Sequence, residues 1–273
     1  MADPRIPADM EAYMRARGWP DHHAQWHYEQ RHDYWHHLAA GGNADAAKIV
    51  AEGEANGWGR STTQEGAPGH GIEFLSMHRA MFELLRDAFP QHGAYLAGWT
   101  TPPQDPADAD DPVPNGAPFE ADKAEGVVVV ETRFADFPSE DDYALFLETS
   151  VRPTPTDPTY RIPDGRTNLH NWLHNRWADK HSPVDLGNPE RNIFNARFWR
   201  LHGWIERLWT GYRRHWNLAD DDPEYRRPID RHKEMMRHPG HHHGHPMPAR
   251  EERGVVEGAG GPPAFSRFFA GER

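Results

Sequence analysis

The chain has 273 residues, no cysteine and a formal net charge of −12. The lack of cysteine excludes disulfides, zinc–thiolate sites, iron–sulfur clusters and thiol nucleophiles. The acidic balance argues against nonspecific nucleic-acid binding, which needs clustered lysine and arginine. Because no apolar run reaches transmembrane length and no secretory signal pattern is visible, we expect no membrane partner and a cytoplasmic location. The chain also holds 20 histidines, which suggests metal binding.

Apolar periodicity, capping residues and helix breakers predict a mainly α-helical fold with minor β-strands and long loops. The expected helices cover residues 7–17, 21–38, 43–56, 74–89, 141–148, 167–180 and 194–216. The segment GVVVVETRF, residues 126–134, predicts a strand because valine-rich runs favour extended backbone. Loops are expected at residues 100–125, which are rich in proline and aspartate, and at the Pro-rich residues 149–166.

The composition changes near residue 220, which predicts two parts of the chain. Residues 1–219 are expected to form one domain. Residues 220–273 are expected to form a charged, His-rich extension that packs on the surface or stays flexible. Within it, the run RHPGHHHGHP either collects metal for the core or is a metal-sticky tail without a role.

The segment TNLHNWLHNRW places His170 and His174 four residues apart, on one face of the expected helix. Two imidazoles spaced in this way can hold one metal ion, and a histidine from a neighbouring helix can complete a three-nitrogen site. His202 has the position for this role, since it belongs to the apolar face of FNARFWRLHGWIERLW. The three residues predict one metal site.

A second group of histidines lies upstream. His78 falls on the buried face of the helix in FLSMHRAMFELL, and His70 precedes it in a Gly-rich loop from which it can reach the same site. A third ligand has to come from DHHAQWHYEQRHDYWHHL. We favour His27, which lies in the apolar stripe of that helix, and keep His36 as the alternative because it is nearer the turn. The helix's other histidines at 23, 32 and 37 are expected to be solvated or hydrogen-bonded.

Three motifs together resemble the tyrosinase, catechol oxidase and haemocyanin family of coupled binuclear copper proteins. Phe74-Leu75-Ser76-Met77-His78-Arg79 is similar to the family's F-L-P-W-H-R, and His170-Asn171-Trp172-Leu173-His174 matches H-N-x-x-H. The last helix matches with Phe198, His202, Glu206 and Trp209, where Glu replaces the family's Asp. The resemblance covers about residues 10–216. It implies a tyrosinase-like four-helix bundle around a dicopper centre, with two copper ions held by His27, His70, His78, His170, His174 and His202.

The resemblance also implies an activity, the oxidation of a small phenolic substrate by O2. Catechols or o-aminophenols would give o-quinones or quinone imines, with Asn171 beside the substrate and Phe198 near its ring. Family members that hydroxylate monophenols often carry a water-holding glutamate upstream of H-N-x-x-H, and the nearest position here is Arg161. Asn171 without that glutamate favours oxidation of diphenols or aminophenols over hydroxylation.

Two other functions are compatible with clustered histidines. One is a haemocyanin-like protein that binds O2 or copper without turnover. The other is a zinc hydrolase, which is disfavoured because zinc catalytic sites often include a carboxylate and the histidine motifs carry none. The sequence leaves open the natural substrate, the oligomeric state and whether a chaperone protein delivers copper.

Overall fold

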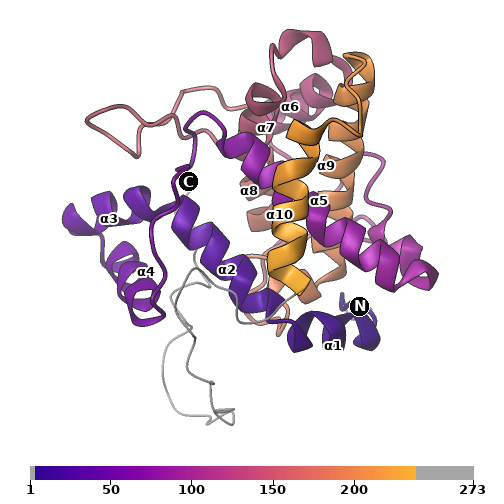
Figure 1. Cartoon of the computed structure of the whole chain (residues 1–273), viewed down its shortest axis with the longest axis horizontal. Helices are drawn as coiled ribbons and strands as arrows, with labels where there is room; N and C mark the ends of the chain where they lie inside the picture. Colours follow the sequence, from indigo (N-terminus) through magenta and orange to yellow (C-terminus); the bar gives the residue numbers. More distant parts are fainter. Residues whose placement is uncertain (1–3, 238–273) are drawn as a thin grey trace.

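The computed structural model describes residues 4–237, and this part of the chain is mainly α-helical, as predicted (Figure 1). The α-helices are α1 (Ala8–Ala16), α2 (Trp19–Gln30), α3 (His32–Ala40), α4 (Ala44–Ala55), α5 (His70–Ala88), α6 (Ala121–Thr132), α7 (Glu140–Glu148), α8 (Leu169–Arg176), α9 (Ala196–His215) and α10 (Pro223–Arg237). Short 3-10 turns occur at Pro90–Leu96, Phe134–Asp136 and Asn192–Phe194. No helix between residues 4 and 237 is both long and apolar enough to cross a bilayer.

The strand predicted at residues 126–134 is wrong, because these valines belong to helix α6. Three of the four valines are buried, and only Val128 is largely exposed. The preceding residues ADKAE favour a helix, and the helix continues through the valines. Tertiary packing there overrides the preference of valine for β-structure. Gly126 allows the fit, since a Cβ there would lie 2.3 Å from the carbonyl oxygen of Arg166. Within the described residues, extended pairing is limited to isolated bridges at Arg5–Asn195 and Val151–Arg161.

The single helix expected at residues 21–38 is two helices, α2 and α3. The break lies at Arg31, which is buried and whose Nε donates to Glu65 Oε2 at 2.6 Å. Beyond the break, α3 packs against α4, and this pair lies to one side of the helices α5 to α10 (Figure 1). The pair has its own apolar cluster, which includes Tyr28, Trp35 and Ile49.

The larger core surrounds α5 and α9, the two longest helices of the described chain. Helix α5 packs against α7, α9 and α10, and α8 packs against α7 and α9. A backbone contact holds the segment after α5 close to α9, since a Cβ on Gly98 would lie 2.2 Å from the carbonyl carbon of Gly203. Gly98 also has a φ of +75°, which L side chains rarely adopt. The contact fixes the turn of α9 that carries His202.

The extension expected from residue 220 begins as a helix, α10, which packs along α5 (Figure 1). Its attachment is partly apolar, because Ile229 and Met236 are buried. The backbone carbonyl of Met236 also accepts a hydrogen bond from Trp19 Nε1 at 3.0 Å. The His-rich run at residues 238–245 lies outside the described residues.

Candidate metal centre

A cluster of six buried histidines lies where α2, α5, α8 and α9 meet. We call His23, His27 and His78 the first half-site, and His170, His174 and His202 the second half-site. None of the six is more than 4% exposed. The structure therefore brings His27 and His78 together with the three histidines predicted in the downstream helices.

Ring nitrogens in this cluster are close enough to share metal ions. One nitrogen from each of His23, His27 and His78 lies within 4.8 Å of the others, and the same holds for His78, His170 and His202. His78 belongs to both groups, and its ring stacks on that of His202 with a centroid distance of 4.1 Å. His174 completes the cluster, with its ring centroid 4.6 Å from that of His170. These buried groups could hold metal ions.

The two histidines on α5 and α9 are oriented in the same way. His78 Nδ1 lies 2.9 Å from the carbonyl oxygen of Phe74, and His202 Nδ1 lies 2.8 Å from that of Phe198. In each case the acceptor is one turn earlier on the same helix. A carbonyl acceptor fixes the proton on Nδ1 and leaves Nε2 with its lone pair, which is the arrangement that metal-bound histidines show. His78 Nε2 is buried and has no hydrogen-bond partner among the described residues.

The HxxxH pairs on α2 and α8 are oriented by one loop. His23 Nδ1 lies 2.8 Å from the carbonyl oxygen of Pro189, and His174 Nδ1 lies 2.8 Å from that of Leu186. Both carbonyls belong to the segment between α8 and α9. This segment therefore orients one imidazole of each half-site, although the two lie far apart in the sequence.

Burial keeps the six imidazoles neutral. It lowers the pKa of His23 to about 4 and that of His174 to about 3. Burial, reinforced by the neighbouring histidines, also lowers the pKa of the remaining cluster members well below the usual value: His27, His78, His170 and His202. A neutral imidazole has a free lone pair, and removing a proton before metal binding is unnecessary. The donor set therefore fits ions that prefer nitrogen ligands, copper among them.

His70 does not join either group of three. It is the first residue of α5 rather than part of a loop, and its Nε2 lies 2.9 Å from Glu148 Oε2. Its Nδ1 lies 3.2 Å from Gln30 Oε1, so both ring nitrogens face polar side chains. Burial alone would lower the pKa of His70, but the carboxylate of Glu148 raises it. The ring of Trp26 stacks on His70 and meets His27 edge-on, which places His70 behind the first half-site.

His36, the alternative to His27, lies on α3 and belongs to the separate α3–α4 pair. Its Nε2 lies 3.5 Å from the hydroxyl of Tyr28, and its ring stacks on that of His32. Of the two candidates, His27 and not His36 lies in the cluster with His78.

Of the two residues predicted to act on the substrate, Phe198 contacts the cluster, whereas Asn171 makes its side-chain contacts with the end of α7 and the start of α8. The ring of Phe198 is fully buried and stacks on His202 with a centroid distance of 3.9 Å. Phe198 also meets the rings of His23 and His174 edge-on, so it lies between the half-sites. Asn171 is buried, and its Nδ2 donates to the carbonyl oxygen of Glu148 at 2.9 Å and to Asn168 Oδ1 at 2.8 Å.

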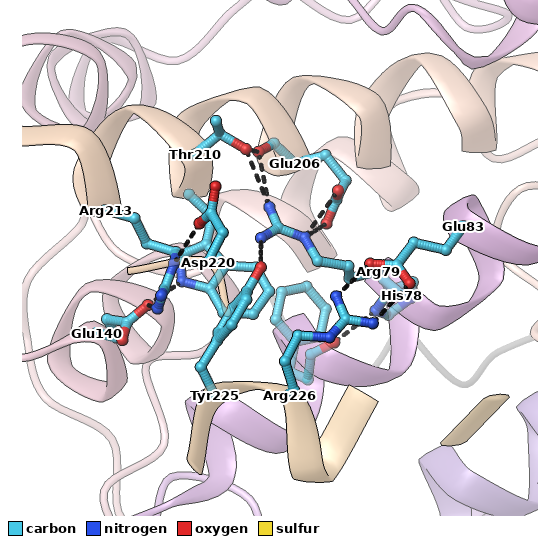
Figure 2. A network of polar contacts seen from close by, with 12 residues as sticks. His78, Arg79, Glu83, Glu140, Glu206, Thr210, Arg213, Asp220, Tyr225 and Arg226 are labelled. Atoms are coloured by element: carbon cyan, nitrogen blue, oxygen red, sulfur yellow. Dashed lines mark hydrogen bonds and ion pairs between the residues drawn. The ribbon is translucent and has the colours of Figure 1, made fainter. Parts of the chain in front are cut away.

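An ion pair joins the helices that carry His78 and His202. Arg79, the residue after His78, donates from Nε to both carboxylate oxygens of Glu206 at 3.0 Å (Figure 2). Glu206 lies one turn after His202 on α9. The same guanidinium contacts Thr210 and Tyr225 (Figure 2). It also lies over the ring of Trp209, 3.9 Å from the ring centroid. Glu206 and Trp209, which match the last-helix motif, therefore hold Arg79 of α5 against α9 close to the cluster.

The sequence reasoning missed His23, and a usable signal was present. His23 and His27 have the same four-residue spacing as His170 and His174. The apolar stripe placed His23 only near its edge, but a second i, i+4 histidine pair is better evidence for a metal site than the apolar stripe. Glu148 was also missed, because nothing in the sequence connects it to His70.

Comparison of the chain with protein-family models, curated proteins and solved structures found no match. The interpretation of the cluster therefore depends on its geometry.

Proposed function

We propose that the six-histidine cluster is a dicopper site of the tyrosinase, catechol oxidase and haemocyanin kind, at which O2 oxidises a catechol or an o-aminophenol. The observation that supports this most strongly is that two half-sites of similar make-up lie side by side, with His78 of the first stacked on His202 of the second. Each half-site has an HxxxH pair on one helix and a single histidine on a long helix. Nitrogen donors alone, without carboxylate, suit copper in both of its oxidation states.

The proposed ligands are His23, His27 and His78 for one ion, and His170, His174 and His202 for the other. His70 Nε2 lies 2.9 Å from the carboxylate of Glu148 and His70 is in neither group of nitrogens, which is why His23 replaces His70 in the proposal. Helices α2, α5, α8 and α9 would then form the four-helix bundle that the family resemblance implies. Two copper ions, when bound, would supply the redox chemistry that O2 reduction needs and that no side chain of this protein provides.

The side chains of the chain orient and shield this chemistry. The carbonyls of Pro189, Leu186, Phe74 and Phe198 hold four imidazoles with Nε2 toward the cluster. Phe198 provides an apolar surface for an aromatic ring and excludes water from the space between the half-sites. Each catechol gives up two electrons and two protons, and O2 accepts four of each to become two water molecules. Two catechols are therefore oxidised for each O2.

The nearby polar groups favour diphenol oxidation over monophenol hydroxylation. Arg161 donates from Nη2 to the hydroxyl of Tyr34 at 2.8 Å, and it brings no carboxylate to the position of the water-holding glutamate. Asn171 donates its amide protons to Glu148 and Asn168, so it stabilises the start of α8 and the end of α7. We propose that a catechol, which is more acidic and more easily oxidised than a phenol, is the preferred substrate class.

A second function is favoured by the depth of burial. The cluster histidines are at most 4% exposed, so O2 needs far less space to reach them than a phenol does. A haemocyanin-like protein that binds O2 without turnover fits this burial. In the oxidase, helices or side chains around Phe198 have to move to admit the substrate ring.

Copper loading of the full chain tests both functions. We expect the apo-protein to take up two copper ions and to develop a strong near-ultraviolet absorption band when hydrogen peroxide is added. Oxygen uptake with catechol then separates the functions: sustained uptake, with two quinones formed per O2, supports the oxidase, and the band without uptake supports the carrier. Copper bound without the band would contradict the paired site.

A further inference from the structure

A second pair of histidines lies outside the cluster, on helix α3. His32 and His36 are one turn apart, and their rings stack with a centroid distance of 4.0 Å and an interplanar angle of 23°. Both side chains are partly exposed, unlike those of the cluster. They lie on α3, which packs against α4 to one side of the other helices (Figure 1), and neither belongs to the two groups of nitrogens in the cluster.

The surroundings of His32 resemble those of a metal ligand. Its Nδ1 lies 3.2 Å from Asp33 Oδ1. A histidine that binds metal through one nitrogen usually donates its other N–H to a carboxylate, which fixes the ring and makes the free nitrogen more basic. Asp33 is itself held in place, because Arg60 donates to its two oxygens at 2.7 Å and 2.6 Å. The position of His32 is thus fixed with Nε2 available.

His36 is also prepared to bind an ion. Burial and the neighbouring His32 lower the pKa of its ring, which keeps the imidazole neutral at pH 7. Its contact with the Tyr28 hydroxyl is 3.5 Å long, at the limit of a hydrogen bond and therefore weak. Burial raises the pKa of Tyr28 to about 12, so this phenol stays neutral and does not compete as an anion.

Carboxylates supply negative charge around the pair. Asp33 lies beside His32, and the charge of Glu54, on α4, acts on both His36 and Tyr28. A cation at the first turn of a helix is opposed by the helix dipole, and these two carboxylates offset that effect.

We propose that His32 and His36 bind one divalent transition-metal ion of the imidazole-preferring kind, such as Zn²⁺ or Cu²⁺. Two imidazoles one turn apart on a helix are ligands that such ions accept, and water molecules complete the coordination. Asp33 is a positioning residue, acting on the ion through His32. The site is separate from the proposed dicopper centre and does not depend on it.

Equilibrium dialysis of the full chain against Zn²⁺ tests the site. We expect His32→Ala and His36→Ala each to bind one ion fewer per chain than the wild type, and the double variant to lose no more than either single variant. His37→Ala is the matched control, because His37 is on the same helix and exposed but points to Asp157 rather than to the pair. Zinc bound at other histidines, including residues 238–245, is common to all five proteins and cancels in the comparison. Equal zinc content in wild type and both single variants would overturn the proposal.

Asp33→Asn tests the positioning role, since it keeps an acceptor for His32 and removes the charge. We expect the same number of ions with affinity roughly 10-fold lower, the usual scale for outer partners of metal ligands. An unchanged affinity would overturn the role given to Asp33.

A measurement on the wild type keeps the proposal testable if a variant folds poorly. Diethyl pyrocarbonate modifies histidines whose ring nitrogens are free, and peptide mass mapping locates the modified residues. Zn²⁺ should protect His32 and His36 and leave His37 reactive. Equal modification of all three with and without zinc would show that the pair does not bind the ion.

Discussion

In the first half-site, His23 and His27 lie one turn apart on α2, and His78 follows on α5. In the second half-site, His170 and His174 lie one turn apart on α8, and His202 follows on α9. Both long-helix histidines are oriented by the carbonyl of a phenylalanine one turn earlier. The placement of the histidines on their helices is thus similar in both halves, and the larger differences lie in what surrounds them.

The first half-site has polar surroundings. His70 and Glu148 form a buried pair behind it, and its helix α5 is bound to α10 through Glu73 and Glu83. Around the second half-site, α9 itself contributes fully buried aromatic side chains such as Trp199, Trp204 and Trp209. We therefore expect charge-changing substitutions and acid to act more strongly on the first half-site.

The largest effect is expected from removing the long-helix ligands. His78→Ala should abolish catechol oxidation and remove the ion of the first half-site, because His78 is the ligand that α5 supplies to that ion. His202→Ala should also abolish oxidation but keep the ion of the first half-site. Both losses of oxidation rate should exceed the roughly 10–100-fold effect of substituting a residue that only orients a ligand. Elemental analysis measures copper content and O2 uptake measures oxidation. Loss of both ions in His78→Ala would contradict the assignment of His78 to one ion and show that it serves both groups of nitrogens.

The next comparison sets His23 against His70 within the first half-site. His23→Ala should remove one copper ion and lower oxidation more than about 100-fold, whereas His70→Ala should keep both ions and lose less than about 10-fold. The reason is that the nitrogens of His23 lie with those of His27 and His78, whereas the nitrogens of His70 face Glu148 and Gln30. The reverse result, with copper lost only in His70→Ala, would support the ligand set inferred from the family motifs.

These two residues also show how far the sequence could predict the site. The histidines of the second half-site were predictable as a group because they lie in short, continuous motifs on regular helices. The first half-site was harder, since α2 carries several histidines and the helix break at Arg31 changes which of them face the core. That break depends on a buried ion pair with Glu65, 34 residues away, which no local pattern reveals.

The fold itself was predictable where amphipathic periodicity is strong, as in α5 and α9. It was not predictable at residues 126–134, where valine favours a strand in isolation. There the backbone of Arg166 fits against Gly126, and burial of Val127 and Val130 in the core stabilises the helix. The error arose because tertiary packing, which sequence propensity does not include, decided the structure.

A third comparison concerns the ion pair that joins the two half-sites. Arg79→Ala or Glu206→Ala should each lower the free energy of unfolding by about 3–5 kcal/mol, because each leaves a buried charge without its partner. Both side chains are only 8% exposed. The double variant Arg79→Met with Glu206→Leu should recover most of that loss, since apolar groups can replace a buried pair. Urea denaturation of the metal-free protein measures these values, and an Arg79→Ala loss below about 1 kcal/mol would show that the pair does not hold α5 to α9.

The smallest effect is expected at the attachment of α10 to the first half-site. Burial alone would raise the pKa of Glu73, but hydrogen bonds from His232 and Arg231 lower it to about 2. A carboxyl whose pKa is lower in the folded state stabilises the fold above its unfolded pKa of roughly 4.3, and this stabilisation disappears as the pH falls toward 2. Glu73→Gln should therefore lower the free energy of unfolding of the metal-free protein by on the order of 1 kcal/mol at pH 7. The deficit relative to wild type should shrink progressively between about pH 4.5 and pH 2. Glu224→Gln is the matched control, since Glu224 pairs with Arg227 within α10 itself and both are largely exposed. A deficit that stays constant down to pH 2 would mean that Glu73 stabilises the contact by its shape and not by its charge.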